Sequence, residues 1–218
     1  MSEHDSLRTM LRQIERGQAQ DALAPLRRLI ARGRRTTPPS WRAPMSMLGR
    51  AYVELRDYPR ARAAYATALL AHQAARDVEG TILCLGGLGL CALGLGAPAD
   101  AAQHLQQAIA LCERSRNAPA ELAWHPHLDA ALAQLHRGAL RIPRLTRWVA
   151  LLDAAGQTSA AAEITVRLAE VALDQHELTV ARDALRSATE RLSQLEDDAM
   201  RQRLSNQIAV AQRVANPT

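Results

Sequence analysis

The sequence predicts an all-α protein, a right-handed solenoid built from stacked helical hairpins. An alanine-centred pattern recurs along the chain, with anchors at Ala22, Ala61, Ala101 and Ala181 spaced by 39, 40 and 80 residues. Hydrophobic residues make up 48% of the chain but aromatic residues only 3%, and Phe is absent. Ala and Leu, which then supply the core, are among the best helix formers. Gly and Pro fall where helices are expected to end and to begin.

Five copies of the repeat can be followed along the chain, each predicting one pair of helices. The first is weak, Gly17 followed by Ala22-x-x-x-Leu26-x-x-Leu29, and the second is strong, Leu48-Gly49-x-x-Tyr52 followed by Ala61-x-x-x-Tyr65-x-x-Ala68. The third reads Leu88-Gly89-x-x-Ala92, Gly96, Ala101-x-x-x-Leu105-x-x-Ala108. The 80-residue step predicts a degenerate fourth repeat, with Gly138 at its turn and Pro143 and Arg147 at the anchor positions. The fifth reads Leu168-Ala169-x-x-Ala172, then Ala181-x-x-x-Leu185-x-x-Ala188.

The second repeat closely resembles the tetratricopeptide pattern: Leu-Gly-x-x-Tyr on a first helix, then Ala, an aromatic residue and Ala on a second. The resemblance covers about residues 5–194, and its period near 40 exceeds the usual ~34. It is similar to the extended repeats of several bacterial regulators and scaffold proteins. The resemblance implies a solenoid that binds proteins, with the first helix of each pair lining a concave face.

One domain, residues 1–218, is expected. Its hairpins pair helices 5–16 with 19–32, 40–56 with 59–77, 79–94 with 98–115, 119–137 with 142–154, and 158–174 with 178–194. A helix at 197–213 would cap the last apolar face. Pro59, Pro98 and Pro143 are expected near the starts of second helices, and Pro44 and Pro126 near the starts of first helices, where the missing N–H costs nothing. Gly17, Gly96, Gly138 and Gly156 are expected to mark helix ends. Pro25 falls inside a predicted helix, which it should kink.

A partner protein or peptide is the predicted ligand, bound in an apolar concave groove. Projection of the tetratricopeptide register places these residues on that face: Arg50, Val53, Leu83, Leu90, Leu93, Leu128, Leu132 and Leu135. The leucines are spaced by three and four, so they share helix faces and would form one continuous strip. The alternative is that the same leucines pack between adjacent helices. The glycines around them would make the helix at 79–94 thin and adaptable. Self-association is a further expectation, with Trp41, Trp124 and Trp148 as contact residues.

Nucleic acid is the rival ligand. The net charge is +5, all 27 basic residues are Arg, and one cluster contains Arg27, Arg28, Arg32, Arg34 and Arg35. Such a cluster attracts phosphates, but it also complements the negative end of a helix. Base stacking needs aromatic side chains, and the chain has three Trp and three Tyr. These considerations favour a protein partner over nucleic acid.

Enzymatic and metal chemistry find little support in the sequence. Cys84, Cys91 and Cys112 lack metal-ligand spacing and are expected to be reduced and buried in a cytoplasmic protein. Neighbours two apart on a helix diverge, which argues against a metal site at His125-x-His127-x-Asp129. The uncharged segment 80–99 has the length of a membrane span, but its repeat register favours a buried helix. Gly87-x-Gly89-x-x-Ala92 lacks the strand that a dinucleotide site requires. We therefore expect no cofactor and no catalytic residue.

Overall fold

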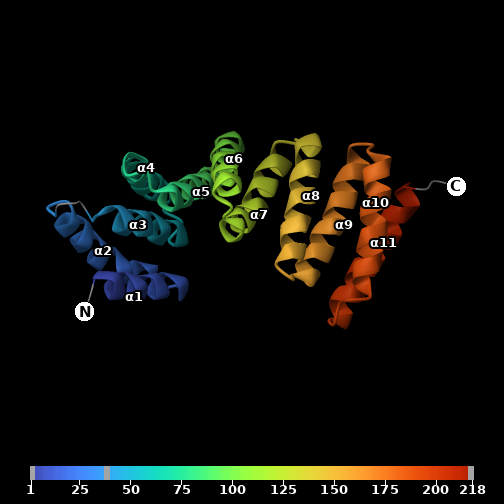
Figure 1. Cartoon of the computed structure of the whole chain (residues 1–218), viewed down its shortest axis with the longest axis horizontal. Helices are drawn as coiled ribbons and strands as arrows, with labels where there is room; N and C mark the ends of the chain where they lie inside the picture. Colours follow the sequence, from blue (N-terminus) through green and yellow to red (C-terminus); the bar gives the residue numbers. More distant parts are fainter. Residues whose placement is uncertain (1–2, 37–39, 216–218) are drawn as a thin grey trace. The chain divides into compact units, whose positions relative to one another are not determined.

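The computed structural model describes residues 3–36 and 40–215, which form eleven α-helices and no strand (Figure 1). In chain order they are α1 (Glu3–Glu15), α2 (Ala19–Gly33), α3 (Arg42–Glu54), α4 (Tyr58–Ala74), α5 (Val78–Gly94), α6 (Pro98–Ser115), α7 (Ala118–Gln134), α8 (Gly138–Ala154), α9 (Thr158–Asp174), α10 (Leu178–Leu192) and α11 (Asp198–Ala215). The all-α class and the expected sequence of helical hairpins with a final helix are confirmed.

Two prolines lie elsewhere than expected. Helix α8 begins at Gly138, four residues before the expected start at 142, so Pro143 lies inside the helix and not at its first turn. Pro126, expected near a helix start, lies inside α7. Pro25 lies inside α2 as expected, whereas Pro59 and Pro98 occupy the first turns of α4 and α6. Gly138 therefore marks the beginning of a helix, not a turn.

The helix ends repeat with a period that the alanine pattern only partly revealed. Left-handed backbone occurs every 20 residues, at Arg56, Arg76, Gly96, Arg116, His136, Gly156 and His176. After each such residue, the next amide donates to a carbonyl five residues back; Asp57 N to Tyr52 O, at 2.9 Å, is one example. This is the Schellman end of a helix. One helix with its turn therefore takes 20 residues, and one hairpin takes 40.

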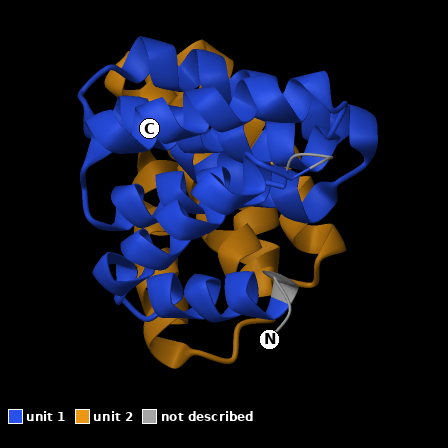
Figure 2. Cartoon of the chain, turned by 90° about the vertical axis from the view of Figure 1, so that its left-hand side faces the viewer, with its two compact units in different colours: residues 1–128 blue, residues 129–218 orange. Residues whose placement is uncertain are grey.

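Contacts between Cα atoms divide the chain into two compact units, residues 1–128 and 129–218 (Figure 2). Unit 1 contains α1 to α6 and the first part of α7, and unit 2 contains the rest of α7 with α8 to α11. Within each unit, helices that follow one another pack together, as α5 does on α4 and α6, and α9 on α8 and α10. The expectation of a single domain over 1–218 stays a prediction.

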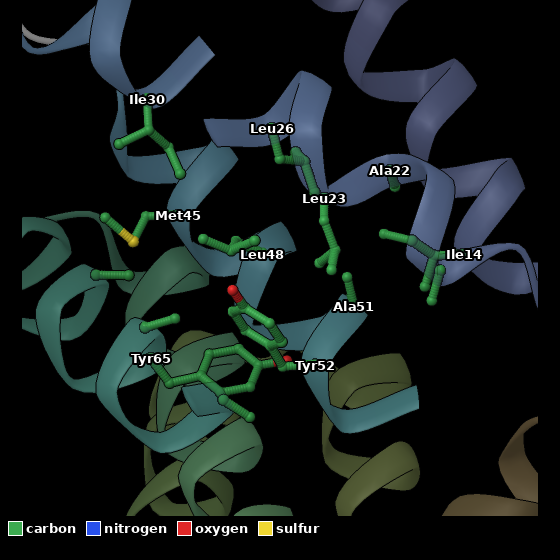
Figure 3. Close-up of a cluster of buried hydrophobic side chains, with 14 of the residues drawn as sticks. Ile14, Ala22, Leu23, Leu26, Ile30, Met45, Leu48, Ala51, Tyr52 and Tyr65 are labelled. Carbon is green, nitrogen blue, oxygen red and sulfur yellow. The ribbon is translucent and has the colours of Figure 1, made fainter. Parts of the chain in front are cut away.

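The core of unit 1 is built from small and aliphatic side chains around two tyrosines. Figure 3 shows labelled side chains of α1 to α4 converging, among them Ile14, Leu26, Leu48 and Tyr65. The anchor alanines Ala22, Ala61 and Ala101 are fully buried. At these positions a larger side chain would force the helices apart, which explains why the pattern repeats Ala.

Large side chains from neighbouring helices pack directly against glycines of α5. A Cβ added at Gly86 would lie 2.3 Å from the Trp124 ring, and one at Gly87 would lie 2.4 Å from the Tyr65 ring. Neither position has room for even a methyl group. The helix is thin at these glycines, as expected, but the expectation that it is adaptable is wrong, because neighbouring rings fill the space.

Unit 2 uses the same packing without aromatic rings at its anchors. Ala169 and Ala172 of α9 and Ala181 and Ala188 of α10 are fully buried. Helix α11 packs on both α9 and α10, as expected of a final helix covering the last apolar face. Trp148 of α8 is only 8% exposed. The expectation that Trp148 makes contacts between copies of the chain therefore does not fit its burial.

The three cysteines, Cys84, Cys91 and Cys112, are free and buried, as expected. Burial raises the pKa of each thiol to about 11. A thiol with so high a pKa stays protonated at neutral pH and is a poor nucleophile. Over residues 3–36 and 40–215, which include the uncharged segment 80–99, no helix has both the length and the apolar character needed to cross a membrane.

Candidate partner-binding surface

The predicted apolar strip is interrupted. Leu128 and Leu132 of α7 are 0% and 2% exposed, so the expectation that they face solvent is wrong. They continue a buried stripe of α7 that begins with Glu121 and His125. Residues spaced by three and four do share a face, but here that face is turned inward. The alternative interpretation, packing between helices, holds for these two leucines.

The other predicted surface residues are at least partly exposed. Leu83 of α5 is 41% exposed, and the following residues are half-buried: Arg50, Val53, Leu90, Leu93 and Leu135. Arg50 donates to Glu15 across 3.3 Å, so α3 and α1 are linked at this face. In unit 1 the most exposed predicted side chain is therefore Leu83.

A groove lies in unit 2, between α9 and α11. Its wider part encloses about 400 Å³ and is lined by Glu170, Leu173, Asp174, Asn206, Gln207, Val210, Ala211 and Val214. A narrower part of about 290 Å³ is lined by Glu163, Ile164, Val166, Arg167, Glu170, Arg203, Leu204 and Gln207. Glu170 and Gln207 line both parts, so the groove is continuous. On α9 it runs from 163 to 174, roughly 16 Å at the helical rise per residue.

The wider part of the groove combines apolar and acidic side chains. Val210 and Val214 are 62% and 60% exposed, and they lie four residues apart on one face of α11. Glu170 and Asp174 lie four apart on α9, and neither pairs with a cation among the residues that the structure describes. Two exposed valines beside two unpaired carboxylates form a surface suited to an apolar and basic ligand.

At the narrower end the charges are compensated within the chain. Arg141 donates two hydrogen bonds to Asp129, Nε to Oδ1 at 2.7 Å and Nη2 to Oδ2 at 3.1 Å. Arg167 Nη1 donates to the same Oδ2 at 3.1 Å, and Arg203 pairs with Glu163. Asp129 is almost completely buried and so fixes both guanidinium groups. This cluster ties α7, α8 and α9 of unit 2 together.

A second polar network lies in the core of unit 1. His72 of α4 places Nδ1 2.7 Å from Asp77 Oδ2 and Nε2 3.0 Å from Ser46 Oγ. The Asp77 carboxylate also accepts the amide of Gly80, which caps α5. This backbone hydrogen bond, followed by the bond from His72, lowers the pKa of Asp77. An ionised carboxylate only accepts hydrogen bonds, so Nδ1 of His72 carries a hydrogen.

The order Ser46–His72–Asp77 is that of a hydrolytic triad, yet its surroundings favour a structural role. Ser46 is 2% exposed, and its Oγ lies 3.2 Å from the carbonyl oxygen of Arg42. It sits inside α3, where backbone N–H groups are used by the helix and do not converge on an oxyanion. The network joins α3, α4 and the first turn of α5.

The His125-x-His127-x-Asp129 motif does not converge on a metal. His125 is buried 3.5 Å from Glu121 of the same helix, and the His127 ring lies 6.2 Å from the Trp124 ring. Asp129 is bound by arginines. Burial lowers the pKa of His127. Among the described residues, no group of three His, Cys, Asp or Glu side chains has the geometry to hold a metal ion.

The stacked hairpins, with a groove between successive first helices, define a helical-repeat protein of the solenoid class. Residues 42–114 match the model of the tetratricopeptide repeat family. The matched residues include the Leu48-Gly49-x-x-Tyr52 motif, so the family model and the motif point to the same repeat. A search of curated proteins found no match.

Solved structures share the fold over almost the whole chain. A protein of Podosopora anserina, named as a kinesin light chain with nearly identical TPR-like repeats, has a TM-score of 0.66 at 17% identity, covering 99% of this chain and 97% of that one. The apo form of RapI has a TM-score of 0.66 at 10% identity, covering 98% and 85%. Aspartyl phosphate phosphatase F from Bacillus subtilis has a TM-score of 0.67 at 13% identity, covering 96% and 58%. At these identities the likeness concerns the fold.

Proposed function

We propose that the chain is a non-catalytic scaffold that binds a helical segment of a protein partner in the α9–α11 groove. The observation that carries the proposal is the pairing of Val210 and Val214 with Glu170 and Asp174 along one continuous groove. An amphipathic helix fits such a site, because its apolar residues also recur at three and four. Its flanking residues would be Arg or Lys, which complement the two carboxylates.

The proposal moves the centre of the binding surface away from the strip expected in the middle of the chain. Leu128 and Leu132 are buried, whereas the groove offers exposed apolar side chains. Leu83, Leu90 and Leu93 of α5 stay a predicted contact surface in unit 1. The helical repeats of the tetratricopeptide family, as a class, imply protein binding and supply the framework on which such a groove is held.

The test uses the full-length chain and a paired control. In Val210→Glu/Val214→Glu, two carboxylates replace side chains whose burial by a partner is worth about 1 kcal/mol each. The control, Ser205→Glu/Ala209→Glu, adds the same charge at exposed positions of α11 that do not line the groove. Binding of a fluorescent basic amphipathic peptide is measured by anisotropy, alongside capture of proteins from a lysate of the native host.

We expect the wild-type chain and the control variant to bind the basic peptide equally and to capture the same partner. The groove variant should bind the peptide about tenfold or more weakly and lose the partner. Equal binding by all three proteins, or equal loss in both variants, would contradict the assignment of the groove. A groove variant whose thermal unfolding matches that of the control shows that the loss is not one of folding.

A further inference from the structure

The positive charge of the chain is concentrated in its first hairpin. Residues 1–35 contain eight arginines and four carboxylates, which accounts for four of the five net positive charges. Residues 129–218 contain eleven arginines and eleven carboxylates and are neutral. Unit 1 therefore has a local positive field that the groove in unit 2 lacks.

This charge borders a groove between α1 and α2. The groove encloses about 380 Å³ and is lined by Ser6, Thr9, Met10, Gln13, Pro25, Arg28, Leu29 and Arg32. On each helix these positions follow the three-and-four spacing of a single face. Leu29, Pro25 and Met10 form an apolar floor, and Arg28 and Arg32 stand on one wall. The lining contains no carboxylate and no aromatic ring.

Arg28 and Arg32 differ from the other arginines nearby. Arg27 donates to the Tyr52 hydroxyl at 2.6 Å, and Arg34 lies over the Trp41 ring at 5.6 Å. By contrast, within residues 3–36 and 40–215 neither Arg28 nor Arg32 has a carboxylate in ion-pair distance or a hydrogen-bond partner for its side chain. Both are exposed. Two guanidinium groups are thus available to an external anion.

We propose that the α1–α2 groove binds an acidic amphipathic helix of a protein partner. Arg28 and Arg32 are one helical turn apart, so two carboxylates at positions i and i+4 of a partner helix match their spacing. Apolar side chains beside those carboxylates would cover Leu29 and Pro25. The apolar floor favours a protein over nucleic acid, whose phosphates would leave the floor uncovered and whose bases would find no ring to stack on.

The inference goes beyond the proposed function, because it assigns a second groove of opposite charge. The α9–α11 groove presents Glu170 and Asp174 and takes a basic segment, whereas the α1–α2 groove presents Arg28 and Arg32 and takes an acidic one. Each site therefore has its own peptide probe. The two proposals can fail separately.

The experiment measures anisotropy of three labelled peptides of about 16 residues, roughly four helical turns, on the full-length chain. They share a leucine face and differ only in flanking Glu, Gln or Lys. Mixed-sequence double-stranded and single-stranded DNA are measured in parallel. The variants are Arg28→Glu/Arg32→Glu and Leu29→Gln. The matched control is Arg62→Glu/Arg137→Glu, at two exposed arginines outside the groove.

The wild-type chain should bind the Glu peptide about tenfold more tightly than the Gln peptide. Arg28→Glu/Arg32→Glu should lose that preference, and Arg62→Glu/Arg137→Glu should keep it. Leu29→Gln should weaken binding of the Glu peptide several-fold without affecting binding of DNA. Val210→Glu/Val214→Glu should bind the Glu peptide normally, even if its basic-peptide binding is lost.

Three results would overturn the inference. The first is a Gln peptide that binds as tightly as the Glu peptide. The second is equal loss in the groove variant and the control, which would mean attraction by net charge alone. The third is DNA bound more tightly than the Glu peptide and released by the Arg28→Glu/Arg32→Glu change, which would make the groove a nucleic-acid site. Thermal unfolding of each variant verifies that the hairpin is intact.

Discussion

At the scale of single residues, the Asp77 carboxylate links a helix cap to the buried His72 ring. Hydrogen bonds lower its pKa below the ordinary value of 3.8, so the folded chain holds this proton less tightly than the unfolded chain does. The resulting stability is fully present above pH 3.8 and is lost as the pH falls through the lower, folded-state pKa. The Asp77→Asn variant can still cap α5. We expect its free energy of unfolding to fall less steeply than that of the wild-type chain as the pH is lowered.

The measurement is the free energy of unfolding in urea at several pH values between about 3 and 6. The difference between wild type and Asp77→Asn should be largest at the upper end and shrink toward the lower end. Asp57→Asn is the matched control, because Asp57 caps α4 without a histidine partner. A pH-independent difference for Asp77→Asn would show that the charge is not what matters.

Burial separates two leucines that the sequence treats alike. Leu132→Glu places a charge at a position 2% exposed and should cost about 4 kcal/mol or more. Leu83→Glu, at a position 41% exposed, should change the free energy of unfolding by less than about 1 kcal/mol. Chemical denaturation of both variants checks this. A similar loss of unfolding free energy in both variants would mean that Leu83 makes a contact that stabilises the fold.

The spacing of the leucines in the sequence does not tell which face of a helix is exposed. Spacing by three and four identifies a helix face, but a first helix packs on the hairpins before and after it, so a leucine face can be turned inward. That is the case for Leu128 and Leu132. Val210 and Val214 lie in the predicted final helix, where no repeat register assigns an inner face. Their exposure follows from how α11 packs on α9 and α10, which only the structure shows.

At the scale of helices and turns, the repeat pattern, together with the expectation of a capping helix, predicted the helices that the structure describes, most of them to within a few residues. The turns between the helices were harder to predict from the sequence. Gly96 and Gly156 carry the left-handed backbone that glycine adopts freely, so the sequence itself signals a helix end at these two positions. Arg76 and His136 adopt the same conformation without glycine's signal. The packing of the flanking helices therefore imposes the turn, at a cost of about 1–2 kcal/mol in backbone strain.

Substitutions at two equivalent turns test this cost. Nothing lies within 4 Å of a Cβ added at Gly96, so Gly96→Ala adds backbone strain without a clash. It should lower the free energy of unfolding by about 1 kcal/mol. Arg76→Gly should raise it by a similar or smaller amount, while Arg76→Ala, which keeps a Cβ, should leave it within about 0.5 kcal/mol. Urea unfolding measures the free energy of unfolding of all three variants. A Gly96→Ala variant as stable as the wild-type chain would contradict the proposed backbone strain.

At the scale of the whole molecule, the arrangement of contacts governs how stability is distributed. Helix α1 packs on α2 and α3, and α9 packs on α8, α10 and α11, so among the described residues of each unit these helices contact near neighbours in the chain. In such a protein, stability is approximately a sum over repeats and the interfaces between adjacent repeats. The opposite charges of the two grooves can then be held by separate units, each with its own core.

Hydrogen exchange on the intact chain tests that distribution. Leu26→Ala removes a fully buried side chain from unit 1 and should cost about 2–5 kcal/mol locally. We expect faster amide exchange in α1 to α3, because α2 packs on α1 and α3, and unchanged protection in α9 and α10. Leu204→Ala, at a buried position of α11, should do the reverse, speeding exchange in α9 to α11 and sparing α3 and α4. Uniform loss of protection from either substitution would mean that the chain opens as one cooperative body.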